Sequence, residues 1–180
     1  MPKRDIRVFD LWQETVGMLT REGILLCSVN SDGAPNVMTI GWMTAGVVWG
    51  KPIVTVYVRP TRFTYTYLEQ VPEFTVNVLP PEHAEALQFC GTASGRDVDK
   101  LAHTGLTAVP AQRVTAPVIE QAVIHYECRI VHKSDLIEAN LAPELQSNYP
   151  HRDLHRVYMG EVLAAYASED ARQRLQRTPL

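Results

Sequence analysis

The feature that most constrains the fold is a turn sequence between two apolar segments near the N-terminus. SDGAPN, residues 31–36, has Asp-Gly at its centre and joins GILLCSVN (23–30) to NVMTIGWMT (36–44). An Asp-Gly pair between apolar runs is a strong signal for a tight β-hairpin, which we expect over 24–43. Parallel strands need a crossover of a dozen or more residues. The hairpin therefore argues against a doubly wound parallel sheet.

The remaining chain alternates between β-rich segments and short helical segments. Each β-rich segment is bounded by turn residues, and the helical segments have apolar spacing or proline-to-glycine polarity. Further strands are expected at 52–58, 73–79, 122–133 and 156–167, and helices at 8–20, 61–70, 80–91, 97–106 and 169–177. We therefore expect a mainly β fold, a six-stranded antiparallel split β-barrel of Greek key type with short peripheral α-helices, forming one domain over residues 1–180.

Bulk properties limit the partners and the compartment. The net charge of −3 provides no basic field for nucleic acid, and no apolar run is long enough to cross a membrane. The N-terminal MPKRDIRVFD lacks the apolar segment of a signal peptide. Cys27, Cys90 and Cys128 contain no CxxC pair, which fits reduced thiols. These features predict a cytoplasmic protein that binds neither nucleic acid nor membranes.

Several catalytic and metal motifs are missing. Gly91 and Gly95 have three residues between them and are followed by Arg96, so the segment is not a Walker motif, and no GxGxxG follows a strand. His151 and His155 are spaced i, i+4 but lack the Glu of HExxH. No G-x-S-x-G elbow occurs. We therefore expect neither a bound metal nor a catalytic side chain.

The stretch CGTASGRDVDKL is suited to binding phosphate. Ser94 and Gly95 offer a hydroxyl and unhindered N–H groups ahead of a helix, and Arg96 and Lys100 add positive charge. The alternative is an ordinary loop in which Asp97 caps the helix.

A second cluster, RPTRFTY, combines arginines with hydroxyl groups. The guanidinium group is a planar donor fork and threonine a neutral donor, which together suit a phosphate monoester. The alternative is that the arginines are solvated surface residues. The residues concerned are Arg59, Thr61, Arg62, Thr64 and Tyr65.

The strand NVMTIGWMT places polar groups among bulky, adaptable side chains. Such a surface can hold a planar heterocycle, with polar groups reading its edge. The alternative is that the large side chains belong to the core. The polar residues are Asn36, Thr39 and Thr44, and the large ones are Met38, Trp42 and Met43.

In this order, the stretches resemble the flavin reductase-like family of FMN-binding split β-barrels, which includes the flavoredoxins. The matching text is GAPNVMTIGWMT, PIVTVYVRPTRFTYTYLEQVPEFTVNVLP, CGTASGRDVDKLAHTGLT and HRVYMGEV, and it covers roughly residues 20–165. The resemblance implies a homodimer that holds FMN, or in some members FAD, near the dimer interface. By position, it implies flavin-ring contacts at Asn36, Met38, Thr39, Trp42 and Met43, and phosphate-side contacts at Arg59, Arg62, Thr64 and Tyr65 with support from Ser94, Gly95, Arg96 and Lys100.

The resemblance also implies an activity. The leading interpretation is an FMN-dependent oxidoreductase, an NAD(P)H:flavin reductase in which hydride passes to flavin N5 and the protein supplies position and exclusion of water. The second is a flavoredoxin-like electron carrier without NAD(P)H oxidation of its own. The third is a barrel that has lost flavin and serves as a binding module. A redox partner or a monooxygenase would accept the reduced flavin.

Overall fold

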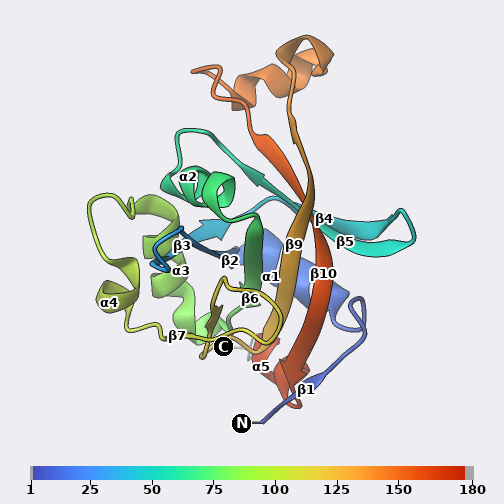
Figure 1. The fold of residues 1–180 in the computed structure, drawn as a ribbon, viewed down its shortest axis with the longest axis vertical. Helices are drawn as coiled ribbons and strands as arrows, with labels where there is room; N and C mark the ends of the chain where they lie inside the picture. The colour runs from blue at the N-terminus through green and yellow to red at the C-terminus, as the bar shows by residue number, and fades with distance from the viewer. Residues whose placement is uncertain (1, 177–180) are drawn as a thin grey trace.

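The computed structural model describes residues 2–176 and is built around one antiparallel sheet (Figure 1). β1 (Lys3–Asp5) pairs with β10, and β7 (Ala108–Val109) pairs with β8 (Val118–Ile119) in a separate ribbon. The expected mainly β, antiparallel fold is confirmed. The path of the main sheet is β3 (Pro35–Ile40), β2 (Ile24–Val29), β6 (Glu73–Val78), β9 (Ile124–Asp135), β10 (Arg156–Ser168), β5 (Lys51–Val58) and β4 (Met43–Val48).

The predicted first hairpin is confirmed, but the predicted count of six strands is wrong. β2 and β3 pair across the Asp-Gly turn, with Val29 opposite Pro35. The segment 36–44, expected as one strand, divides at Gly41 and Trp42, and the main sheet has eight strands. β4 starts at Met43 and pairs with β5 at the other end of the sheet path.

The β4–β5 hairpin lacks the usual turn residues. Its two-residue loop is Trp49–Gly50, and both residues have positive φ, 54° and 69°. This is the backbone pattern of a type I′ turn, which normally favours Asn-Gly or Asp-Gly. Trp at the first position is one reason why the sequence pattern did not reveal β4.

All five predicted helices are present, but the one expected at 8–20 begins at Trp12, and the one expected at 97–106 covers only Lys100–Thr104. The expected helix at 80–91 is a 3₁₀ turn (Pro81–His83) followed by α3, and α4 ends at Gly105 in the left-handed conformation (φ 68°). The helix expected at 169–177 is α5, and Arg177 lies outside the described residues. The helices are α1 (Trp12–Arg21), α2 (Phe63–Gln70), α3 (Ala84–Thr92), α4 (Lys100–Thr104) and α5 (Ala171–Leu175), with further 3₁₀ segments at Glu138–Asn140 and Pro143–Asn148.

Both faces of β2 are buried, and β3 pairs with it along one edge. Ile24 and Leu26 point into the main core, whereas Leu25 and Cys27 point into a second core against α3. α2, α3 and α4 gather beside β3 at one side of the sheet (Figure 1). The edge strand β3 is therefore flanked by helices, and the loops that join these helices lie along it.

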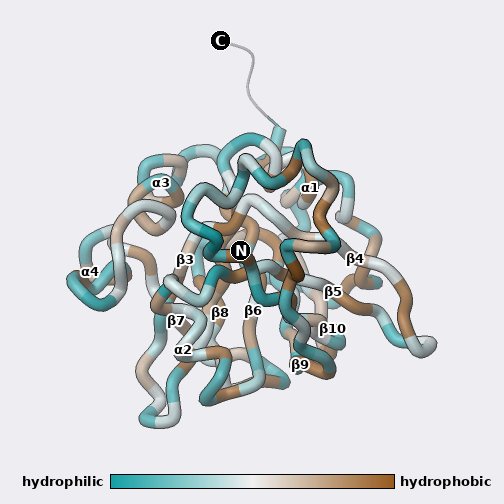
Figure 2. Tube along the Cα trace, turned by 90° about the horizontal axis from the view of Figure 1, so that it is seen from above, coloured by the Kyte–Doolittle hydropathy of each residue, from teal (hydrophilic) through white to brown (hydrophobic). Residues whose placement is uncertain are grey.

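Two segments project from the body of the fold. The connection between β9 and β10 extends beyond the sheet at the top of Figure 1. The β4–β5 hairpin extends to one side and carries hydrophobic residues, as the brown segments of Figure 2 show. Val47 and Trp49 of this hairpin are 66% and 63% exposed. Within residues 2–176, no helix is both long and apolar enough to span a membrane.

Candidate functional site

Two adjoining cavities lie along β3. The loop cavity, about 190 Å³, lies between the start of α2 and the segment 90–96 at the end of α3. The aromatic cavity, about 240 Å³, lies between Trp42, Tyr57 and His155. Met38 and Arg62 line both. The two cavities therefore form one elongated site with a polar end and an aromatic end.

Gly95 allows the segment that lines the loop cavity to pack closely against β3. A Cβ added at Gly95 would lie 2.3 Å from Asn36 Oδ1 and 3.0 Å from Phe63 Cδ1. Asn36 is itself fixed, because its Nδ2 donates to Thr64 Oγ1 at 2.8 Å. Only glycine allows this close approach, so the loop after α3 meets both β3 and α2.

The two arginines of the loop cavity differ in whether other protein groups already bind their side chains. Arg96 donates to the Thr61 carbonyl at 3.2 Å and lies 5.0 Å over the Phe63 ring. The Arg62 side chain has neither a hydrogen bond nor an ion pair with any residue in 2–176. Arg62 is therefore the cation best placed to neutralise an anion in the site.

Lys100 has a structural contact that its sequence position did not reveal. Its buried Nζ donates to the carbonyls of Val37 and Cys90, each at 2.9 Å. Burial lowers the pKa of Lys100, with the charge of Arg62 acting in the same direction and Cys90 opposing it. Lys100 thus ties α4 to β3 and α3, and its ammonium group is largely engaged by the protein.

Aromatic rings that contact one another at an angle line the aromatic cavity. Trp42 is 43% exposed, and its ring centroid lies 4.4 Å from that of His155, with the planes 37° apart. His155 Nδ1 is 2.9 Å from the Tyr149 hydroxyl. Burial lowers the pKa of His155 to about 4, and the nearby charge of Arg59 also lowers it. The imidazole is therefore neutral near pH 7, and Tyr149 fixes its orientation.

The Arg59 side chain binds groups in the connection between β9 and β10. Its guanidinium group pairs with Asp153 at 2.5 Å and donates to the Asn148 carbonyl at 3.0 Å. The same group lies 5.0 Å over the Tyr149 ring. The hydrogen bond from Arg59 lowers the pKa of the Asp153 carboxyl. Arg59 thus positions the segment that carries Tyr149 and His155.

Most residues selected from the sequence meet in this site. Asn36 borders a neighbouring cavity and reaches the site through Thr64. Met43 is buried in the main core, and Tyr65 packs against that core with Arg156 5.3 Å over its ring, so neither lines the two cavities. The selected residues that do line them are Met38, Thr39, Trp42, Arg59, Arg62, Thr64, Ser94, Gly95, Arg96 and Lys100.

The structure adds residues that the sequence patterns did not assign to this site. Tyr57 and Phe63 line it, and Tyr149 supports it from a distant segment. His155 was considered as a metal ligand with His151. No set of three or more His, Cys, Asp or Glu side chains within residues 2–176 is arranged to hold a metal ion. The position of Tyr57 within its strand could suggest that it lines the site. No local sequence pattern shows that Tyr149 lies near Trp42.

The fold is like that of flavin reductase-like proteins. A model of the family described as "Flavin reductase like domain" matches residues 18–179. The chain therefore belongs to this family.

Similarity to other sequences is moderate. The chain is 28% identical over 147 residues to an uncharacterized protein of Pyrococcus abyssi, covering 82% of this chain and 74% of that protein. It is 30% identical over 129 residues to an uncharacterized protein of Archaeoglobus fulgidus. That match covers 72% of this chain and 63% of the relative, so the chain spans less than two thirds of the Archaeoglobus protein.

Solved structures share the fold at low identity. The flavoredoxin of Desulfovibrio vulgaris (Miyazaki F) is 23% identical with a TM-score of 0.66, over 82% of this chain and 69% of that chain. An FMN-binding domain of a flavin reductases-like enzyme from Shewanella baltica is 20% identical with a TM-score of 0.66, over 92% and 77%. The NADH:FAD oxidoreductase of Streptomyces globisporus C-1027 is 24% identical with a TM-score of 0.60, over 81% and 74%.

Proposed function

We propose that this protein is a flavin-dependent oxidoreductase that binds FMN in the two adjoining cavities and oxidises NAD(P)H. The observation that carries the proposal is the pairing of an aromatic cavity with a polar cavity that contains Arg62, a cation without an ion pair among the described residues. A flavin mononucleotide has the same division, with a planar ring at one end and a phosphate at the other. The family membership and the FMN-binding structural relatives support the same assignment.

The residues of the chain supply binding and orientation. A bound flavin would supply the redox chemistry by accepting hydride at N5. Trp42 and Met38 would provide apolar surface for the ring, and Arg62 with the Ser94–Gly95 segment would lie beside the phosphate. The neutral imidazole of His155, held by Tyr149, can exchange a hydrogen bond with a ligand in the aromatic cavity without adding charge.

The second candidate is an electron carrier that holds flavin without oxidising NAD(P)H. The similarity to the Desulfovibrio flavoredoxin favours it, whereas the similarity to the Streptomyces NADH:FAD oxidoreductase favours the reductase. Anaerobic addition of NADH or NADPH to the FMN-loaded protein separates them. Bleaching of the flavin absorbance within the time of enzyme turnover is expected for the reductase. Flavin that stays oxidised with both donors, and is reduced by dithionite, would indicate the carrier.

We also propose a homodimer that works in the cytoplasm and passes reduced flavin or electrons to a redox partner or monooxygenase. The exposed hydrophobic residues of the β4–β5 hairpin support self-association (Figure 2). Size-exclusion chromatography with light scattering tests it, because a dimer of this 20.2 kDa chain has twice the monomer mass. Val47→Asp with Trp49→Ser should give a monomer, and a monomeric wild type would contradict the proposal.

A further inference from the structure

His155 presents one ring nitrogen to the protein and leaves the other without a protein partner. Its Nδ1 lies 2.9 Å from the Tyr149 hydroxyl, whereas its Nε2 has no hydrogen-bond partner within residues 2–176. The residue lines the aromatic cavity and is only 9% exposed, yet Nε2 is not sealed off by other atoms. Because Nδ1 is taken by Tyr149, Nε2 is the ring nitrogen that a ligand in this cavity can reach.

The hydrogen-bonding needs of Tyr149 determine which nitrogen of His155 carries the proton. A neutral imidazole has one N–H donor and one acceptor nitrogen. Tyr149 is 7% exposed, and Nδ1 of His155 is the only acceptor for its hydroxyl among the described residues. A proton on Nδ1 would leave the buried hydroxyl hydrogen without an acceptor, which is unfavourable. The hydroxyl therefore donates to Nδ1, and the proton of the imidazole lies on Nε2.

Arg59 strengthens this arrangement from the far side of Tyr149. Its guanidinium group lies 5.0 Å over the Tyr149 ring. Burial raises the pKa of the Tyr149 hydroxyl, so the hydroxyl keeps its proton near pH 7, and the charge of Arg59 opposes this shift. A nearby positive charge polarises the hydroxyl and makes it a better donor. The same charge, after burial, lowers the pKa of His155, against the opposing charge of Asp153.

We propose that Tyr149 is a positioning residue that holds the proton of neutral His155 on Nε2, so that His155 donates a hydrogen bond to a carbonyl oxygen of a planar ligand. The ligand is planar because it must fit against the ring of Trp42, whose centroid lies 4.4 Å from that of His155. The ligand must supply an acceptor because Nε2–H is a donor without a partner. A carbonyl oxygen satisfies this neutral donor without burying a further charge.

The inference rests on the proposed function, because it concerns the ring end of the proposed flavin site. Two ligands of that function have a planar ring with a carbonyl group, the isoalloxazine of the flavin and the nicotinamide of NADH or NADPH. A hydrogen bond to the flavin contributes to flavin affinity, whereas a hydrogen bond to the nicotinamide contributes to the KM of the donor. The two sources of the carbonyl are therefore distinguished by which constant changes.

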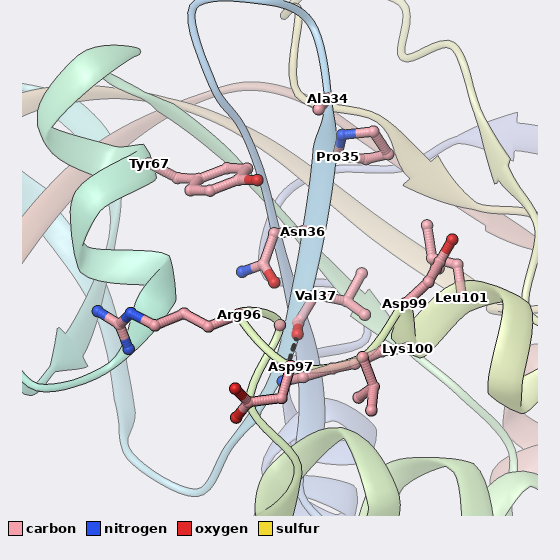
Figure 3. A pocket seen from close by; sticks show the side chains of 12 residues that line it. Ala34, Pro35, Asn36, Val37, Tyr67, Arg96, Asp97, Asp99, Lys100 and Leu101 are labelled. Carbon is pink, nitrogen blue, oxygen red and sulfur yellow. Dashed lines mark hydrogen bonds between the residues drawn. The ribbon is translucent and has the colours of Figure 1, made fainter.

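The test removes the Tyr149 hydroxyl and compares the result with two matched variants. Tyr149→Phe keeps the ring that lies under Arg59. Tyr67→Phe is the control for exposure: Tyr67 is also 7% exposed, but it extends toward β3 in a different cavity, and its hydroxyl has no partner among the described residues (Figure 3). Tyr126→Phe is the control for stability, because it loses a buried hydroxyl hydrogen bond of the same 2.9 Å length, to Thr15 in the main core.

The first measurement locates the proton directly and needs no ligand. In protein with 15N-labelled histidine, the ring chemical shifts separate protonated from unprotonated nitrogens, and couplings to the ring hydrogens distinguish Nδ1 from Nε2. Comparison with His155→Ala assigns the His155 signals among the six histidines. At pH 7 the wild type is expected to carry one proton, on Nε2. A proton on Nδ1, or a doubly protonated ring, would overturn the inference.

The second measurement identifies the ligand that accepts the hydrogen bond. FMN affinity comes from a fluorescence titration, and the KM values for NADH and NADPH come from steady-state kinetics. With the flavin as acceptor, Tyr149→Phe weakens FMN binding about tenfold. With the nicotinamide as acceptor, FMN affinity is unchanged and the KM of the donor rises about tenfold. Tyr67→Phe and Tyr126→Phe are expected to change neither constant.

A double-mutant cycle shows whether Tyr149 acts through the imidazole. In a His155→Ala background, Tyr149→Phe should have no further effect on FMN affinity or KM. Equal losses with and without His155, or unchanged constants in Tyr149→Phe alone, would overturn the inference. Absence of FMN binding would contradict the proposed function. A proton on Nε2 in that case would still support the positioning role of Tyr149, because it is measured without ligand.

Discussion

Replacing Gly95 by alanine tests the geometry of the site with one methyl group. The new Cβ would lie 2.3 Å from Asn36 Oδ1 and 3.0 Å from Phe63 Cδ1. Asn36 is 6% exposed and bonded to the buried Thr64, so it can yield only by losing that hydrogen bond. Overpacking of this kind costs about 1–3 kcal/mol. For a chain of this size, that corresponds to a fall in Tm of roughly 2–12 °C.

The control for this variant is Gly46→Ala. A Cβ at Gly46 would meet no atom of residues 2–176 within 4 Å, and neither glycine has positive φ. Thermal unfolding measures the stability of both variants, and fluorescence titration measures their FMN affinity. We expect Gly95→Ala alone to lose stability and to bind FMN about tenfold more weakly, because the 92–96 loop shifts. Equal stability and equal FMN affinity in the two variants would refute the packing of this loop on Asn36.

Three further predictions concern single side chains. Arg62→Gln should weaken FMN binding by roughly 10- to 100-fold and leave riboflavin binding unchanged, because the charge acts on the phosphate; equal losses for both ligands in a fluorescence titration would contradict this. The pKa of His155 is about 4 when folded against an ordinary value of 6.5, so the unfolded state binds more protons and stability falls as pH drops from about 6.5 to 4. In urea unfolding at pH 7 and pH 4.5, His155→Asn should lose less stability than the wild type, and an unchanged loss would be inconsistent with a neutral His155. Lys100→Met should lower the free energy of unfolding by about 2 kcal/mol or more, because two buried carbonyls lose their donor. The control is Lys51→Met, which removes an exposed ion pair and should lower the free energy of unfolding by less than about 1 kcal/mol. Urea unfolding measures both variants.

The sequence was most informative where the signal is local. The Asp-Gly turn predicted the β2–β3 hairpin, and the glycine at 105 marked the end of α4. β4 was missed because Ile40 and Met43 are both apolar, and nothing in the periodicity shows that the chain changes its pairing partner between them. The partner of a strand is a tertiary property that one strand's pattern does not contain.

The sequence predicted which segments form the site, but not the contacts that each side chain makes there. Arginine, serine and glycine near a helix start indicated the loop cavity. Charge alone could not show that Lys100 donates to two carbonyls while the Arg62 side chain has no hydrogen bond or ion pair within residues 2–176. Met43 is a residue type that can contact a ligand, but in this fold it lies in the main core. The Trp42–His155 contact joins residues 113 positions apart, so only the fold could reveal it.

An equilibrium fluorescence titration of the purified protein with FMN, run beside one with riboflavin, tests the central claim most directly. Because it measures binding at equilibrium, it detects both a retained cofactor and a flavin that exchanges as a substrate. The account predicts saturable FMN binding that is tighter than riboflavin binding, because the phosphate would lie beside Arg62 and the 92–96 loop. Absence of saturable binding of either flavin would contradict the assignment of the two cavities as a flavin site.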